Sequence, residues 1–213
     1  MITPQRINRK IRLFLEKMGV CSTPIFVNVE PVEWALYDEC FLNVQKMVEK
    51  CGGKMIVGWA ISETSILIEA IYHAVYQTKE NSVIDITPQV LQNKKILFVE
   101  DINVPYVGAT KDNYRLNITD NPIVDDFISI NKLRHKIINY KERAYNTKIK
   151  ISQVENRIIR DIDNIRTQLE YYILNGNYPN SKCFCGGNKK YYECHREQIL
   201  RFITLINNEY SDS

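Results

Sequence analysis

The sequence lacks the features that would place it in a membrane or a secretory pathway. It contains no run of 18 apolar residues, so we expect no membrane-spanning segment. The basic, amphipathic start "MITPQRINRKIRLFLEKMG" has neither the apolar core nor the small-residue cleavage site of a secretion signal. A net charge of +3 is too small to indicate a nucleic-acid partner by itself. We therefore expect a cytoplasmic protein that begins with an ordinary helix.

What the chain does contain indicates a globular protein. Of its 213 residues, 45% are hydrophobic and 25% are charged, which is enough to bury a core. Three of the six cysteines lie close together beside a histidine near the C-terminus, and the other three are scattered through the first quarter. One metal cluster and three separate thiols fit a reducing compartment better than three disulfides do.

Three regions differ in pattern. In residues 1–122, the helix-like "YDECFLNVQKMVEK", which Gly52 and Gly53 end, precedes the strand-like runs "MIVGWAI", "SILIEAIYHAVYQ", "SVIDITP" and "KILFV". A helix followed by antiparallel strands predicts an α+β domain. We interpret residues 123–176 as a helical region and 177–213 as a metal-binding tail.

The helical region has apolar residues at every third or fourth position from Leu133 to Tyr172. This spacing predicts one long amphipathic helix or two in close succession. Ten Lys or Arg against five Asp or Glu lie between Lys132 and Glu170. The basic surface fits a solvated face of a packing helix first, a partner-binding or self-associating coil second, and a nucleic-acid surface last.

The tail carries "CFCGGNKKYYECH", in which Cys183, Cys185, Cys194 and His195 form two close pairs separated by eight residues. Four soft ligands in this arrangement suit a tetrahedral zinc ion. Because protein would fill all four coordination positions, the expected zinc is structural. The stretch 183–195 resembles the SEC-C motif, a short zinc module first described at the C-terminus of the SecA translocation motor. The resemblance implies a module that docks protein partners and that is appended to many unrelated domains.

The stretch "IEAIYHAVYQTKENSVIDITP" holds two apolar runs around a polar turn, with His73 in the first run and Asp85 in the second. In an antiparallel hairpin centred near Lys79, residues whose numbers sum to 158 lie opposite each other, so His73 faces Asp85 on one side of the sheet. The carboxylate would then fix the imidazole tautomer and leave the other ring nitrogen as a base.

Cys40 is the thiol that this base would serve. It opens the expected helix after "YDE", beside unpaired amides and the positive end of the helix dipole, and both favour thiolate. The order nucleophile at a helix start, then histidine and aspartate on adjacent strands, resembles the papain-like superfamily and its transglutaminase-like branch over residues 34–88. There "HAVY" and "DITP" resemble the strands that carry the histidine and aspartate. The resemblance implies Cys40 as nucleophile, His73 as general base and acid, and Asp85 as the residue that orients it.

Two further residues are candidates for the oxyanion site or the cleft. Trp34 lies six residues before Cys40, where papain-like enzymes often keep a glutamine, and its indole N–H is a donor, although a core position also explains a tryptophan. Asn43 is one helical turn beyond Cys40, and packing or surface exposure explains it as well.

These patterns predict a cysteine-dependent acyl-transfer enzyme of the thiol protease, isopeptidase, deamidase or transglutaminase type. We expect a protein or peptide substrate, partner docking through the zinc tail or the basic helix, and self-association through that helix as an option. The alternative is a non-catalytic, protein-binding adaptor on a degenerate papain-like scaffold. A weaker alternative is nucleic-acid binding through the basic helix.

Overall fold

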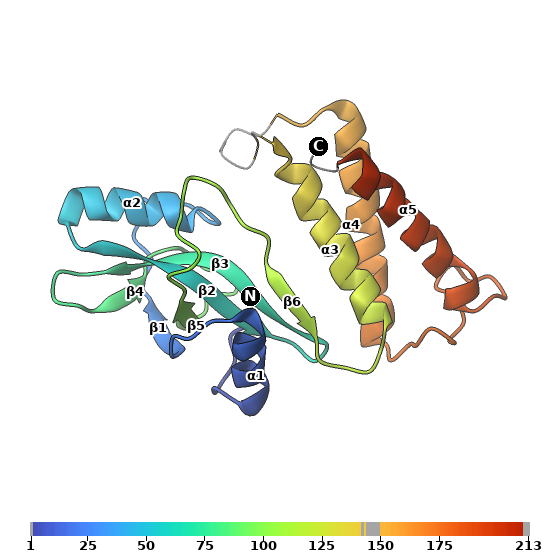
Figure 1. Ribbon diagram of the computed structural model, residues 1–213, viewed down its shortest axis with the longest axis horizontal. Helices are drawn as coiled ribbons and strands as arrows, with labels where there is room; N and C mark the ends of the chain where they lie inside the picture. The colour runs from blue at the N-terminus through green and yellow to red at the C-terminus, as the bar shows by residue number, and fades with distance from the viewer. Residues whose placement is uncertain (1, 142, 144–149, 211–213) are drawn as a thin grey trace. The chain divides into compact units, whose positions relative to one another are not determined.

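The computed structural model describes residues 2–141, 143 and 150–210 (Figure 1). The chain forms two compact units. Unit 1 comprises Met1–Val107 and Asn113–Leu116, and unit 2 comprises Gly108–Asp112 and Asn117–Ser213. Helices and strands are both present, which confirms the predicted α+β class. No helix among the described residues is long and apolar enough to cross a membrane.

Unit 1 is built from two helices and a six-stranded sheet. Its elements are α1 (Arg9–Met18), β1 (Ile25–Val29), α2 (Cys40–Cys51), β2 (Lys54–Glu63), β3 (Leu67–Gln77), β4 (Val83–Asp85), β5 (Lys95–Glu100) and β6 (Tyr114–Asn117). The strand order is β2-β5-β1-β4-β3-β6, and β2 also pairs with β3. The first five strands therefore close into a ring, and β6 is added beside β3.

Two apolar clusters hold this ring together. One joins the strands and contains Val27, Ile56, Val75 and Phe98. The other lies under α2 and is formed by Cys40, Val44, Ala74, Tyr76 and Ile86. The alternation of side chains along β3 thus sends Val75 to the first cluster and Ala74 and Tyr76 to the second.

Several elements match the sequence analysis and several do not. The helix that begins at Cys40 and the strands β2, β3, β4 and β5 are confirmed, and Gly52 caps α2 with a positive φ of 74°. The sequence analysis did not predict β1 or β6. The four predicted strands pair with one another only in antiparallel directions, as expected, and the unpredicted β1 adds a parallel pairing with β4. Both missed strands are short and take their place through pairing with distant segments.

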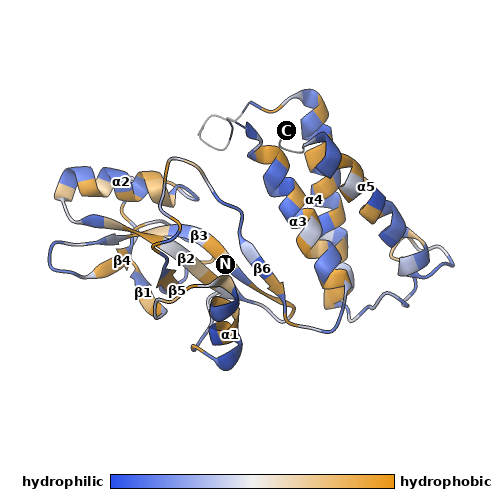
Figure 2. Ribbon diagram, in the orientation of Figure 1, coloured by the Kyte–Doolittle hydropathy of each residue, from blue (hydrophilic) through white to orange (hydrophobic). Residues whose placement is uncertain are grey.

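Unit 2 contains α3 (Ile123–Ile138), α4 (Gln153–Leu174), the 3₁₀ helix η2 (Tyr191–Glu193) and α5 (His195–Glu209). The helical region therefore forms two helices, while the apolar positions Ala144 and Thr147 lie outside the described residues. Ser152 and Glu155 form a reciprocal capping box that starts α4. Hydrophobic and hydrophilic residues alternate along α3, α4 and α5, as expected for helices that pack on one face (Figure 2). The sequence analysis did not predict α5.

Candidate active site and metal centre

Cys40 is the first residue of α2, as the sequence predicts. The preceding residue, Glu39, makes no side-chain hydrogen bond to cap the helix, and the first turn holds no acidic residue. Asp38 turns the chain into the helix with a left-handed φ of 61°, a conformation that aspartate tolerates better than most residues. The thiol is buried, with 7% of Cys40 exposed, and it packs with Ala74 and Ile86, the chain neighbours of His73 and Asp85.

The predicted pairing register of the hairpin is wrong by two residues. The structure pairs Tyr76 with Ile84 and Gln77 with Val83, so opposed residue numbers sum to 160 rather than 158. The turn is centred on Glu80 instead of Lys79, because the Thr78 amide donates to the Ser82 carbonyl oxygen at 2.9 Å.

The offset nevertheless leaves His73 and Asp85 on one face. Side chains alternate with a period of two, so a shift of two residues exchanges direct opposition for a diagonal relation without changing the face. The paired residues of β3 and β4 end at Tyr76 and Ile84, and the side chains of His73 and Asp85 lie just beyond this last pair. The His73 Nε2 atom is 3.2 Å from Asp85 Oδ2.

Asp85 is fully buried, and its carboxylate has further partners. Oδ1 accepts from the Thr87 backbone N–H at 3.0 Å, and Oδ2 accepts from the Gln89 side-chain amide at 2.9 Å. These bonds fix both oxygens of the carboxylate, one of which faces the imidazole. The sequence analysis did not identify Gln89, because its only signal is a position four residues after Asp85.

The protonated form of His73 is favoured in this environment. Burial lowers the pKa of the imidazole, but the charge of Cys40, the charge of Asp85 and side-chain hydrogen bonds to both raise it, and the pKa lies well above its usual value. Cys40 and Asp85 therefore both affect the pKa of the ring, and the structure joins His73 to Asp85 by a hydrogen bond. An imidazolium that is hydrogen-bonded to a carboxylate is suited to hand a proton to a leaving group.

Asn43 joins the segment before Cys40 to the segment that follows Asp85. Its side chain accepts from the Leu36 N–H at 3.0 Å, and donates to the Leu36 carbonyl oxygen at 2.8 Å and to Thr87 Oγ1 at 3.2 Å. The residue is 3% exposed. With its amide engaged in this way, Asn43 is placed to position the site rather than to bind an oxyanion.

Trp34 packs on α2. Its ring is half-buried against the cluster that contains Cys40, and the ammonium groups of Lys46 and Lys50 lie 4.4 and 4.7 Å from the ring centroid. Both lysines belong to later turns of α2 than Cys40. These contacts explain the tryptophan through packing and cation–π attraction.

Aromatic rings that the sequence analysis did not single out surround the start of α2. Phe41 stacks on Tyr106 with ring centroids 4.1 Å apart, and contacts Tyr72 at 4.7 Å. Burial, together with the charges of Tyr106 and Cys40, raises the pKa of Tyr72 to about 12. The Tyr72 hydroxyl donates to the Val104 carbonyl oxygen at 3.1 Å, which fastens the loop that follows β5 beside α2.

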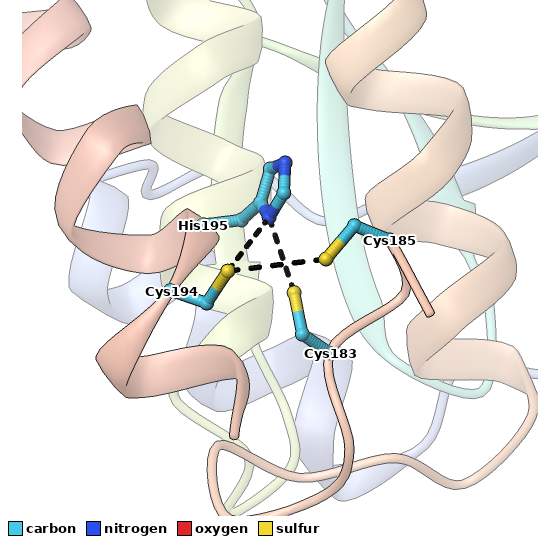
Figure 3. Close-up of side chains that lie close together, drawn as sticks. All are labelled: Cys183, Cys185, Cys194 and His195. Atoms are coloured by element: carbon cyan, nitrogen blue, oxygen red, sulfur yellow. Dashed lines mark hydrogen bonds between the residues drawn. The ribbon is translucent and has the colours of Figure 1, made fainter. Parts of the chain in front are cut away.

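The four predicted metal ligands also come together, in unit 2 (Figure 3). The ligand atoms of Cys183, Cys185, Cys194 and His195 all lie within 4.8 Å of one another. His195 Nδ1 is 3.2 Å from Cys183 Sγ and 3.3 Å from Cys194 Sγ, and the sulfurs of Cys185 and Cys194 are 3.9 Å apart. A tetrahedral metal ion with bonds of about 2.0–2.3 Å requires ligand separations of about 3.6–3.8 Å, so the donor set fits a metal ion.

The backbone around the ligands is built to present them. Gly186 adopts a left-handed φ of 78°, and its N–H donates to the Cys183 carbonyl oxygen at 3.1 Å. Tyr191 is fully buried, and its hydroxyl donates to Asp126 of α3. Arg196, the residue after the last ligand, donates to the same carboxylate at 2.8 Å. The cluster is thus fastened to α3 on both sides of its second ligand pair.

Comparison with known proteins adds no further constraint, because no family model, no curated protein and no solved structure matches the chain. The chemistry must therefore be inferred from the side chains and their contacts.

Proposed function

We propose that the protein is a cysteine-dependent acyl-transfer enzyme with a papain-like or transglutaminase-like core. The observation that carries the proposal is geometric: the buried ring of His73 lies with Nε2 3.2 Å from the Asp85 carboxylate, and the buried thiol of Cys40 packs with Ala74 and Ile86, the chain neighbours of that pair. A thiol, an imidazole and a carboxylate are the nucleophile, the general base and the orienting group that nucleophilic acyl transfer requires.

In the proposed reaction, the Cys40 thiolate attacks the carbonyl carbon of an amide or thioester and forms a tetrahedral oxyanion. The backbone amides of the first turn of α2 are the donors nearest to the sulfur in the chain, and they would face that oxyanion. His73 gives its proton to the leaving amine or thiol as the bond to carbon breaks. Water or an amine then attacks the acyl-enzyme, His73 takes the proton from it, and the thiolate leaves.

Asp85 holds the imidazole in place through these steps and stabilises its positive charge. Its own charge is in turn held by the Thr87 N–H and the Gln89 amide. Protease, isopeptidase, deamidase and transglutaminase reactions differ in the leaving group and in the acceptor, and these four side chains and one backbone N–H serve all four.

For the metal centre, we propose a structural zinc ion in a module of the SEC-C type. Three thiolates and one imidazole favour zinc over harder ions, and four protein ligands leave no position for a substrate. When bound, the ion would cross-link Cys183 and Cys185 to the start of α5. The proposed chemistry of unit 1 involves none of its ligands.

Thiol reactivity tests the proposed enzyme. Wild-type protein treated with iodoacetamide near neutral pH should alkylate at Cys40 far faster than at Cys21 or Cys51, as measured by intact mass and peptide mapping. The advantage should shrink at least ten-fold in His73→Ala. Equal and slow reaction of the three thiols would contradict the proposal.

A second candidate function is a binding adaptor in which unit 2 carries the activity. One observation favours it: a pocket of about 570 Å³ lies beside the metal cluster and is lined by Tyr171, Tyr172, Phe184 and His195. Tyr171 is 72% exposed, as expected for a residue that meets a partner. An inert Cys40 together with partner capture that Tyr171→Ser abolishes would favour this function.

A further inference from the structure

We propose that the substrate of the Cys40 site is a polypeptide segment that carries apolar side chains and a positive charge next to the reacting carbonyl. The inference rests on the proposed function and adds the substrate class to it. It is drawn from three loops of unit 1 that contact either the first turn of α2 or Asp85.

Each of the three loops is fastened to the site by a specific bond or ring contact. Residues 31–39 lead into Cys40, and Asn43 holds Leu36 in this loop by two hydrogen bonds. Residues 86–93 follow Asp85, and Gln89 in this loop donates to its carboxylate. Residues 102–107 follow β5, and Tyr106 in this loop stacks on Phe41, the residue after the nucleophile.

All three loops expose large apolar side chains. We define the apolar rim as six of them, with exposed fractions between 57 and 81%: Leu36, Tyr37, Val90, Leu91, Ile102 and Val107. Single exposed apolar residues are common on protein surfaces, but two in each of three loops that all contact the first turn of α2 are not explained by the packing of unit 1. Their distribution over separate loops suits an extended chain with several side chains better than one small molecule.

The charges of the same loops have one sign. Residues 31–39 contain Glu33, Asp38 and Glu39, and none of the three loops contains Lys, Arg or His, although the chain has 28 Lys and Arg. Glu39 lies close enough to Tyr106 for its charge to contribute to the raised pKa of that phenol, after burial and the charge of Cys40. Lys46 and Lys50 of α2 lie over the Trp34 ring in residues 31–39, but the charges of the loops themselves are acidic, so an apolar rim with acidic groups favours an apolar, basic peptide over an acidic one.

Labelling of Cys40 with peptide electrophiles tests this substrate class. Three probes share one vinyl sulfone and differ in the attached peptide: leucine with lysine, leucine with glutamate, and glycine with serine. We expect the leucine–lysine probe to label wild-type Cys40 at least ten-fold faster than the glycine–serine probe, with the leucine–glutamate probe between them. The rates are measured by intact mass, and iodoacetamide serves as the reagent without a recognition element.

Substitutions of the rim separate recognition from reactivity. The triple variant Leu36→Ser/Val90→Ser/Ile102→Ser should lose at least five-fold of the advantage of the leucine–lysine probe and keep its iodoacetamide rate. The pair Glu33→Gln/Asp38→Asn should reduce the preference for lysine over glutamate. Leu13→Ser on α1 is the matched control, because Leu13 is 51% exposed on another element and should change neither rate.

The outcomes distinguish this inference from the proposed function. If Cys40 reacts rapidly with iodoacetamide in a His73-dependent way but shows equal rates with all three probes, the enzyme stands and the substrate class is wrong. A wild-type dimer that the triple rim variant dissociates would overturn the inference by assigning the rim to a second copy of the chain. A Cys40 that is inert to every reagent would refute the enzyme itself.

Discussion

The carboxylate of Asp85 shows how much of the site depends on single atoms. Its Oδ2 atom lies 3.2 Å from His73 Nε2 and also accepts from the Gln89 amide, while Oδ1 accepts from the Thr87 N–H. Thr87 in turn accepts a hydrogen bond from Asn43, which holds the loop before Cys40. A continuous series of hydrogen bonds therefore connects the segment that precedes the nucleophile with the imidazole.

The titration of His73 is the first prediction at this scale. Because Cys40 contributes the largest upward effect on the pKa of His73, NMR titration should give a pKa above 6.5 in wild type and a lower one in Cys40→Ala. Since the folded-state pKa is raised, the stabilisation by protonated His73 is fully present below the unfolded-state pKa of about 6.5 and is lost as the pH rises through the folded-state pKa.

Chemical denaturation of wild type and His73→Gln across this pH range checks the predicted loss of stability with rising pH. The difference in unfolding free energy between the two proteins should be largest at the acidic end and should shrink as the pH rises. A difference that grows with pH would show that the neutral ring is the favoured form.

Asn43 supports a second prediction. Asn43→Ala leaves the buried Thr87 hydroxyl and the Leu36 backbone without their hydrogen bonds, and we expect a loss of about 1–3 kcal/mol in unfolding free energy. We also expect slower alkylation of Cys40, because the loop before it loses its anchor. Gln45→Ala, an exposed position on the same helix, should change the unfolding free energy by less than about 0.5 kcal/mol and leave the alkylation rate unchanged.

At the scale of elements, the sequence indicated the helix and strands that carry the site better than the long-range pairing and loop contacts that join them. The helix start at Cys40 was predictable because the acidic turn before it and the glycines after Cys51 are local signals. The prediction that His73 and Asp85 share one face of the sheet was correct although the predicted register was wrong by two residues, because side chains return to the same face every two residues. The parallel pairing of β1 with β4 and the bond from Gln89 to Asp85 depend on long-range closure and on a loop conformation, and no local pattern encodes either.

The attachment of the metal cluster to α3 supports a prediction about elements. Asp126 is 4% exposed and receives hydrogen bonds from Arg196 and Tyr191. Arg196→Ala leaves a buried carboxylate with one weak partner, and we expect a loss of about 1–3 kcal/mol after allowing for the partial exposure of Arg196. Arg201→Ala, on the same helix in an exposed pair with Glu197, is the control and should cost less than about 0.5 kcal/mol. Denaturant unfolding of the two variants compares them directly, and equal losses would rule out the anchoring role.

At the scale of the whole molecule, the two sites belong to different compact units. Removal of the metal with a chelator, or Cys183→Ser, should lower the unfolding temperature of unit 2 and abolish the binding of one metal ion per chain in native mass spectrometry. The alkylation rate of Cys40 should stay within about two-fold of the wild-type rate, because Cys40, His73 and Asp85 all lie in unit 1. Loss of Cys40 reactivity on chelation would instead mean that unit 1 depends on the metal.

The closed ring of strands in unit 1 bears on how any polypeptide can be held. Many peptide-binding domains capture a chain by backbone pairing along an open sheet border, which tolerates nearly every sequence. In unit 1, each of β2, β5, β1, β4 and β3 already has a neighbour on both sides. Where these pairs form, a guest chain cannot join the sheet as one more strand, so we expect its side chains to supply most of the selectivity and backbone-only mimics to make poor inhibitors.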